Sequence, residues 1–419
     1  MLTGTNLSHA KRHNLQIVHE TIRLYAPISR ADVARRTGLT AQTISNLVRQ
    51  LVDAGLVVET ARATGGRGAP PIQLEVNPDA AFAVGLDLDT DHLTGVLVDL
   101  SGRVRARIHH GVRLSSPTDA LDLCEATMAA LTDEVGIGPD RVWGVGLGIP
   151  GPMRPGPDGT YLASPIAFPE WHDEPLAERF SERVGLPVYI ENNATAAALG
   201  EHWYGAGRHL ETFFYVYLGS GLGGGLVVQG TPFEGHAGNA GEIGYLSPCT
   251  GPEDERPTHV GELFNLARLY DRLAKGGVEA SSPADLLALH ESGDPTFEGW
   301  FARVAEELGR VLFTVRVIVD PEATFVGGPW PDRLLADLLD RARAHLDVAA
   351  VPGGLDAPAL RLATSGADAG ALGVATLPLY HAFAPRQRAA LRRADASEND
   401  GASAANGAGS AFRRSGVIE

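Results

Sequence analysis

The segment from Ser29 to Leu51 constrains the fold more than any other part of the sequence, because it carries the start and stop signals of two consecutive helices. Ser29 can cap the first helix, with Asp32 three residues on in the capping-box position. Gly38 ends that helix, since glycine readily takes the left-handed conformation of a tight turn. Thr40 then caps a second helix, whose apolar residues follow helical spacing: Ile44, Leu47, Val48 and Leu51. The pattern predicts a helix-turn-helix.

The outer face of that second helix carries short or planar hydrogen-bonding side chains, the types that reach base edges in the major groove of DNA. They are Gln42, Thr43, Ser45, Asn46 and Arg49. A helix at about 9–25 precedes the unit, and two β-like runs at 56–60 and 72–76 follow it. The glycine-rich stretch between these runs carries Arg67, which suits insertion into a narrow minor groove. We therefore expect residues 1–77 to form a winged helix-turn-helix domain that binds operator DNA.

The distribution of charge agrees with this expectation. Residues 1–71 hold nine lysines and arginines and four acidic residues, a net charge of +5 in a chain whose total is −16. The rest of the chain therefore carries −21, so a basic module is attached to an acidic body, as in a DNA reader with a separate sensor. Taken one at a time, these elements also fit an ordinary helical hairpin followed by a solvated surface hairpin.

Other features of the sequence favour a cytoplasmic protein without a membrane segment. No apolar run of about 18 residues occurs, and the first residues lack the apolar stretch of a secretory signal. The two cysteines, Cys124 and Cys249, are far apart and belong to no paired-cysteine motif. Neither a disulfide framework nor a cysteine-rich zinc site is therefore expected.

From about residue 80 onward, apolar strand-like runs alternate with helical patterns, which indicates an α/β protein in two similar lobes. The densest glycine cluster, residues 218–228, lies between two apolar runs and predicts a hairpin whose backbone amides face a phosphate or another close ligand. By itself this signal is weak, because most glycine hairpins bind nothing. A dinucleotide-binding motif is excluded, since no helix opens at the third glycine.

The order and spacing of five body segments resemble the sugar kinases of the ROK family (repressors, open reading frames, kinases), and residues 29–67 resemble the DNA-binding head of its repressor branch. The five segments are 85–90, 146–152, 191–201, 218–228 and 235–245. The resemblance implies a two-lobed, actin-like (ribonuclease-H-like) α/β fold after the winged helix-turn-helix. It also implies that the third helix of the head enters the major groove and that the protein forms a homodimer or a dimer of dimers.

The same resemblance sets the expected domain boundaries. The body is expected to span residues 80–383, with one lobe at about 80–200 plus a C-terminal helix at about 367–383, and the other lobe at about 201–366. Residues 384–419 are of low complexity and are expected to form a disordered tail. The arginines in this tail fit a solvated segment better than a DNA contact.

Two substitutions separate the chain from the kinases of the family. The resemblance places Asn193 where those kinases have the aspartate that takes the proton from the sugar hydroxyl, and a carboxamide cannot act as a general base. It places Asp89 where the first phosphate hairpin has a glycine, so that a carboxylate repels and obstructs ATP, although Asp87 on the metal side remains. We expect a pseudo-kinase without catalytic residues or a cofactor. Tyr245 replaces the histidine of the family's zinc site, whose cysteines are also missing, and no metal is expected.

The positions that contact sugar in the family are better matched. The residues that the resemblance assigns to this site are Ser164, Asn192, Asn193, Glu242, Tyr245 and Glu262. An amide such as that of Asn193 still hydrogen-bonds a hydroxyl, and Tyr245 is expected to stack on a pyranose face. Without the resemblance, Asn192 would be interpreted as a helix N-cap and Glu242 as a surface acid.

These features predict a DNA-binding transcriptional regulator that responds to a sugar or sugar derivative. The expected role is that of a repressor of carbohydrate uptake or metabolism genes, without kinase activity. Two alternatives stay open at this point: an active ATP-dependent sugar kinase that carries a DNA-binding head, and a scaffold that is controlled by a protein partner. The sequence names neither the sugar nor the operator.

Overall fold

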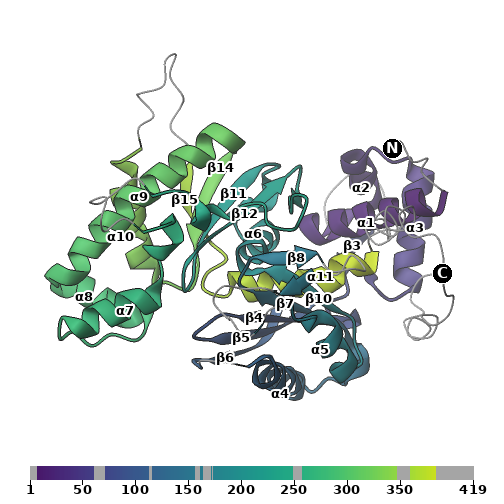
Figure 1. The fold of residues 1–419 in the computed structure, drawn as a ribbon. Coiled ribbons are helices and arrows are strands. Elements are labelled where there is room, and N and C mark those ends of the chain that lie inside the picture. Colours follow the sequence, from purple (N-terminus) through teal and green to yellow (C-terminus); the bar gives the residue numbers. More distant parts are fainter. Residues whose placement is uncertain are drawn as a thin grey trace, which may run out of the picture.

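The computed structural model describes residues 7–60, 71–112, 116–155, 161–163, 171, 173–248, 257–346 and 359–383. Two residues that were predicted to bind a ligand, Arg67 and Ser164, lie outside the described residues, as does the segment 384–419. An N-terminal head and two α/β lobes make up the described part of the chain (Figure 1).

The head contains three helices and a small sheet: α1 (Leu7–Tyr25), β1 (Ile28–Ser29), α2 (Arg30–Thr37), α3 (Ala41–Asp53), β2 (Val57–Thr60) and β3 (Gln73–Val76). Both predicted caps form, since Ser29 Oγ accepts a hydrogen bond from Asp32 N and Thr40 Oγ1 accepts one from Thr43 N, each over 3.2 Å. Gly38 has the expected left-handed backbone, with φ of +70°. Strand β3 lies between β1 and β2 and is antiparallel to both. The predicted winged helix-turn-helix is confirmed.

Lobe one is built on a five-stranded sheet in the order β10-β7-β4-β5-β6. Its strands are β4 (Phe82–Leu88), β5 (Leu93–Asp99), β6 (Val104–His110), β7 (Val142–Ile149) and β10 (Val188–Asn192). Side chains alternate along β4, so Val84 and Leu86 pack in the core that includes α4 (Pro117–Val135) and α5 (Leu176–Val184). Ala83 and Asp87 take the opposite face. A two-stranded ribbon, β8 (Met153–Pro155) and β9 (Tyr161–Ala163), follows β7.

Lobe two is built on a second five-stranded sheet, in the order β13-β12-β11-β14-β15. Its strands are β11 (Phe213–Leu218), β12 (Leu222–Val228), β13 (Thr231–Pro232), β14 (Ala323–Gly327) and β15 (Leu360–Leu362). Phe214 and Val216 face a helical layer made of α7 (Leu266–Lys275), α8 (Pro283–Ser292), α9 (Pro295–Val319) and α10 (Asp332–Arg343). Tyr215 and Tyr217 take the other face of the sheet.

Two helices, α6 (Asn193–Tyr204) and α11 (Ala369–Phe383), pack against each other between the two sheets, at the centre of Figure 1. Glycines permit the close approach, because a Cβ at Gly146 of β7 would lie 1.9 Å from Val374 O of α11. Likewise, a Cβ at Gly225 of β12 would lie 2.4 Å from Ala194 O of α6. Part of the glycine cluster at 218–228 therefore serves helix packing, and the turn at 219–221 is the part that contacts Asp89 of lobe one.

The core of the head is continuous with the core of lobe one. Val18 and Ile22 of α1 belong to the same buried cluster as Leu372 and Leu379 of α11 and Val96 of β5. In Figure 1 the purple helix α1 accordingly lies beside the end of α11 that points toward the head. The head is therefore packed on the body rather than held only through its connecting segment.

The sequence patterns missed several elements and misplaced one. They did not identify β6, α5, α10 or β15, and β6 is an edge strand whose exposed positions carry arginine and valine instead of a clear apolar alternation. One of the helical patterns of the body, at about 261–274, is a 3₁₀ turn, Val260–Glu262, followed by α7 from Leu266 onward. None of the described helices is both long and apolar enough to cross a membrane.

Candidate functional site

The side chains that were predicted to contact bases lie along the side of α3 that faces away from the head core. The core side of α3 is buried: Ile44, Leu47, Val48 and Leu51. On the other side, Gln42, Asn46 and Arg49 are exposed, whereas Thr43 and Ser45 are partly buried. Gln42 Nε2 donates to Asn46 Oδ1 over 3.3 Å, which sets two amides side by side on the outer surface. One turn of an amphipathic helix thus presents a polar, hydrogen-bonding surface of the kind that base edges accept.

A groove of about 450 Å³ runs beside this surface, and its lining residues are Lys11, Thr43, Asn46, Leu47, Arg49, Gln50 and Asp53. Lys11, which the sequence patterns did not place at a site, adds a second cation to the face that carries Arg49. Arg30 and Arg35, by contrast, form ion pairs with Glu59 and Asp32. Among the described residues lining the groove, Lys11 and Arg49 are therefore the cations available to DNA phosphates.

The residues that were predicted to bind sugar gather at the N-terminus of α6, where β10 ends. Asn192 caps this helix, because its Oδ1 accepts a hydrogen bond from Ala194 N over 2.8 Å. Its Nδ2 donates to Glu242 Oε1 over 3.2 Å and so joins lobe one to lobe two. Glu242 is partly buried instead of being a surface acid, and burial raises the pKa of its carboxyl. Asn192 therefore caps α6 and also links the two lobes.

Asn193 is the next residue of α6 and is buried, with 4% of its surface exposed. Its Nδ2 donates to Leu88 O over 3.2 Å, whereas its Oδ1 has no hydrogen-bond partner among the described residues. Asp87 Oδ1 is also buried without such a partner. A Cβ at Gly148 would lie 2.9 Å from Asp87 Oδ1 and 3.4 Å from Asn193 Oδ1, so both oxygens border the same small space. Burial raises the pKa of Asp87 to about 7.

Tyr245 and Glu262 extend the site from lobe two. The Tyr245 side chain is 45% exposed, and its ring centroid lies 5.3 Å from that of His259. Glu262 lies 3.6 Å from His259 and forms an ion pair with Arg268, which leaves its carboxylate less available to a ligand. His259 thus lies beside both Tyr245 and Glu262. An exposed aromatic ring near the Glu242 carboxylate suits the apolar face and the hydroxyls of a sugar.

A residue that no pattern singled out, Asn239, also joins the two lobes. Its Oδ1 accepts a hydrogen bond from Met153 N, and its Nδ2 donates to Met153 O, both over 2.8 Å. A Cβ at Gly151, in the Gly-Pro loop after β7, would be 2.2 Å from Glu242 Oε1 and 2.5 Å from Asn192 Nδ2. This loop therefore packs directly against two of the predicted sugar residues.

Asp89 of lobe one is bound to the glycine-rich turn of lobe two. Asp89 is 2% exposed, and its Oδ1 accepts a hydrogen bond from Ser220 Oγ over 2.6 Å. Its Oδ2 accepts from Ser220 N over 3.3 Å. A backbone amide and a hydroxyl on such a turn are the donors that hold phosphate oxygens in phosphate-binding loops, and here a carboxylate of the same chain takes them.

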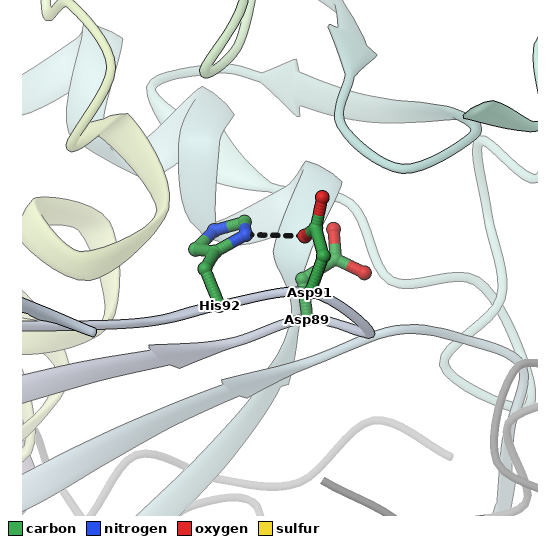
Figure 2. Close-up of side chains that lie close together, drawn as sticks. All are labelled: Asp89, Asp91 and His92. Atoms are coloured by element: carbon green, nitrogen blue, oxygen red, sulfur yellow. Dashed lines mark hydrogen bonds and ion pairs between the residues drawn. The ribbon is translucent and has the colours of Figure 1, made fainter. Parts of the chain in front are cut away.

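Figure 2 shows Asp89 together with Asp91 and His92, which follow it in the turn between β4 and β5. His92 Nδ1 lies 2.7 Å from Asp91 Oδ1. Burial would lower the pKa of His92, but the hydrogen bond to Asp91 and the charge of Asp89 raise it to about 9. Ligand atoms of all three residues lie within 4.8 Å of one another, as in a metal site. Because Asp89 binds Ser220 and Asp91 binds His92, we assign no ion there, and the absence of a metal stays a prediction.

The head and the two-lobed body define a class: a DNA-binding module fused to an actin-like sugar-kinase fold. Residues 83–380 match the model of the ROK family, and residues 16–68 match a model of the MarR family. The chain therefore belongs to the ROK family.

Individual proteins resemble all or part of the chain. The xylose repressor of Caldicellulosiruptor bescii is 28% identical over 338 residues, which cover 76% of this chain and 83% of the repressor. The glucokinase of Halalkalibacterium halodurans is 31% identical over 250 residues, which cover 55% of this chain and 74% of the kinase. A crystal structure of a ROK family transcriptional regulator, a homologue of the Escherichia coli MLC protein, has a TM-score of 0.70 at 22% identity. It covers 91% of this chain and 100% of its own, and at this identity the likeness concerns the fold.

Proposed function

We propose that this protein is a sugar-responsive DNA-binding transcriptional repressor without kinase activity. The observation that carries the proposal is that one helix, α6, begins at the predicted sugar residues and ends against the DNA-binding head. The xylose repressor, which matches 76% of this chain, supports a repressor controlled by a sugar. The glucokinase matches a smaller share of the chain, and its likeness supports a sugar as the ligand of the body.

The head end of α6 rests against α1. The guanidinium of Arg23 lies over the Trp203 ring, 4.1 Å from its centroid, and the Arg23 side chain is only 3% exposed. Arg23 also binds Glu20 of the same helix through two hydrogen bonds, of 2.9 Å and 2.5 Å. A buried cation held by a carboxylate and an aromatic face is a rigid contact, because each partner limits the rotation of the guanidinium. Movement of the C-terminal end of α6 is therefore passed to α1.

The body holds α6 at the same end through a buried carboxylate. Glu201 is fully buried, and its oxygens accept hydrogen bonds from Ala206 N, Thr364 N and Ser365 N, over 2.7 to 2.9 Å. Residues 364 and 365 lead into α11, which shares its core with the head. Thus α6 and α11 reach the head as a connected pair rather than as two independent helices.

The proposed mechanism follows from this arrangement. A sugar that binds at Asn192, Asn193 and Glu242 changes the hydrogen bonds that cross between the lobes, and therefore the angle between the lobes. Because α6 starts at these residues, the change shifts its other end, at Trp203, and reorients the head. In a homodimer or a dimer of dimers, two reoriented heads no longer match the spacing of two operator half-sites, so operator affinity changes.

The absence of kinase activity is proposed on chemical grounds. Asn193 takes the position at which the family's kinases carry a general base, and an amide cannot accept the hydroxyl proton. Asp89 fills the glycine-rich turn with a carboxylate, so the phosphates of ATP meet both a steric block and charge repulsion. The missing base alone lowers the rate by roughly a hundred- to ten-thousand-fold.

The proposed DNA interface comprises α3 and the wing. Gln42, Thr43, Ser45, Asn46 and Arg49 contact base edges or phosphates in the major groove, and Arg67 of the wing enters the minor groove. The exposed outer face of α3 and the neighbouring Lys11 support the first assignment. The assignment of Arg67 rests on its place in the glycine-rich segment between β2 and β3.

The function is tested with purified full-length protein and DNA from the region upstream of its own gene. Fluorescence anisotropy measures operator affinity with and without each sugar of a monosaccharide panel, and a coupled assay measures ATP-dependent phosphorylation of the same sugars. We expect nanomolar operator binding that at least one sugar alters, and no phosphorylation. Kinase rates of roughly 1–100 per second, or operator affinity that no bound sugar changes, would overturn the proposal.

A further inference from the structure

The glycine-rich turn between β11 and β12 could hold an anionic group of a ligand, but Asp89 already occupies it. Ser220 supplies a backbone N–H and a hydroxyl, and both donate to the Asp89 carboxylate. Asp89 Oδ1 also accepts a hydrogen bond from Thr90 N over 2.7 Å, which fixes the orientation of the carboxylate. A ligand phosphate that entered this turn would have to displace a buried, three-fold hydrogen-bonded carboxylate and then lie beside it.

The charged groups near Asp89 also disfavour a bound phosphate. His92 is ion-paired with Asp91, and Arg107 is ion-paired with Asp368, so these cations are already neutralised. Asp87 and Asp89 are both buried, at 1% and 2% exposure. The buried Asp89 carboxylate repels an incoming phosphate dianion much more strongly than a solvated one does, because little water screens it, and Asp87, whose pKa burial raises to about 7, adds to the repulsion where it is ionised.

Two buried hydrogen-bond acceptors at the predicted sugar site also favour a ligand that donates hydrogen bonds. Asp87 Oδ1 and Asn193 Oδ1 are buried acceptors that border the same space and have no partner among the described residues. A buried acceptor without a donor costs free energy, which a ligand recovers by donating to it when the lobes admit it. A sugar hydroxyl donates such a hydrogen bond, whereas a phosphate dianion only accepts.

We propose that the predicted sugar site accepts an uncharged sugar and rejects the corresponding sugar phosphate. Asp89 sets this selectivity because it occupies the place in the β11–β12 turn at which Ser220 would otherwise bind an anionic group. The inference rests on the proposed sugar site and names the chemical class of its ligand. Asp89 thereby has two consequences: it keeps ATP from the body, and it makes the repressor respond to an unmodified sugar rather than to a phosphorylated one.

Calorimetry with the full-length protein tests the selectivity. The probes are glucose, xylose and N-acetylglucosamine, each paired with its phosphate ester, and inorganic phosphate alone. We expect at least one free sugar to bind, and its phosphate ester to bind at least about a hundredfold more weakly. A phosphate ester that binds as tightly as the free sugar overturns the proposal, and so does the failure of every free sugar to bind.

Two substitutions assign the selectivity to Asp89. Asp89→Gly removes the carboxylate and frees both donors of Ser220, so the preference for free sugar should fall to about tenfold or less and inorganic phosphate should begin to bind. Asp89→Asn is the matched control, since it removes the charge but still fills the turn, and it should not gain phosphate binding. Thermal unfolding checks that both variants are folded. If Asp89→Gly is folded and keeps the wild-type preference, Asp89 is not the determinant.

Operator binding separates this inference from the proposed function. The ligand-free protein is titrated with operator DNA in parallel. The operator affinity measured in this way does not depend on which sugar the protein binds. Operator binding that responds only to a phosphate ester leaves the repressor function standing and overturns the selectivity. A protein that binds free sugars selectively but no DNA supports the selectivity and overturns the repressor function.

Discussion

The guanidinium of Arg23 lies 4.1 Å from the centroid of the Trp203 ring, and this contact joins the DNA-binding head to the helix that starts at the predicted sugar site. Asn192 and Asn193 stand at the other end of the same helix, α6, which is twelve residues long. A helix of this length is about 18 Å long and transmits a displacement because its backbone hydrogen bonds resist bending. The predicted sugar site and the head are therefore connected by one rigid element.

Trp203→Ala should uncouple the two ends of α6. The substitution removes an aromatic face that contributes about 1–2 kcal/mol to a desolvated cation. We expect sugar affinity to stay within a few-fold of the wild type, while the sugar-induced change in operator affinity is lost. Trp203→Phe is the control, because it keeps an aromatic face under Arg23 and should preserve most of the response. An undiminished response in folded Trp203→Ala would mean that the signal travels elsewhere.

Substitutions on the DNA face should separate specific from electrostatic binding. Asn46→Ala should weaken operator binding by about 1–3 kcal/mol, with little effect on unrelated DNA, because it removes a side chain that we propose contacts base edges. Lys11→Ala and Arg67→Ala should lower the slope of affinity against salt concentration by about 1 each, since each removes a phosphate or groove contact. Anisotropy titrations at several salt concentrations measure both effects. An unchanged slope in Arg67→Ala counts against the wing assignment.

Restoring the catalytic carboxylate should not by itself restore a kinase. Asn193→Asp returns a possible general base to the start of α6, but Asp89 still occupies the turn that would hold the phosphates. We expect no ATP-dependent phosphorylation by Asn193→Asp in a coupled assay, with sugar binding as the measure that the site is intact. Phosphorylation by this single variant would show that Asp89 is no barrier to ATP.

The close packing of α11 on β7 predicts a strong effect of one added methyl group. Gly146→Ala would place a Cβ 1.9 Å from Val374 O, so we expect a loss of about 1–3 kcal/mol in the free energy of unfolding, or more if the backbone cannot shift. Gly299→Ala is the matched control, because Gly299 lies exposed in α9 with no atom near its Cβ position. It should stabilise the protein by up to about 1 kcal/mol. Denaturant titration of both variants gives the comparison.

The buried residue His19 of α1 predicts a loss of stability at mildly acidic pH. Burial lowers the pKa of His19 from 6.5 to about 4, so the folded protein resists protonation that the unfolded chain accepts. The contribution of neutral, buried His19 to the free energy of unfolding is complete above pH 6.5 and is lost as the pH falls toward 4. At pH 5 the loss is about 2 kcal/mol. Unfolding free energies at pH 7 and pH 5 should therefore differ less in His19→Gln than in the wild type. An equal pH dependence in both proteins would rule out His19 as the source.

The local structure of the head and the positions of the family segments could be predicted from the sequence. The caps at Ser29 and Thr40 each involve a partner three residues away, and the buried face of α3 follows from helical spacing. Interactions of this range depend on the local chain alone, so a sequence pattern captures them. The assignment of Asn193 and Asp89 to altered kinase positions likewise follows from the family segments, because the order of these motifs along the chain does not depend on how the lobes pack.

The tertiary structure decided what these residues contact. Asp89 and Ser220 are 131 positions apart, and Asn192 and Glu242 are 50 apart, so each pair meets only because the two sheets pack around α6 and α11. The same packing partly buried Glu242, which was expected to contact sugar, and brought Trp203 under Arg23. The sequence determined a reader and a sensor with altered kinase motifs. The contacts between the sensor body and the DNA-binding head were decided by long-range packing. The energy of these contacts depends on shape complementarity between distant segments, which no local pattern describes.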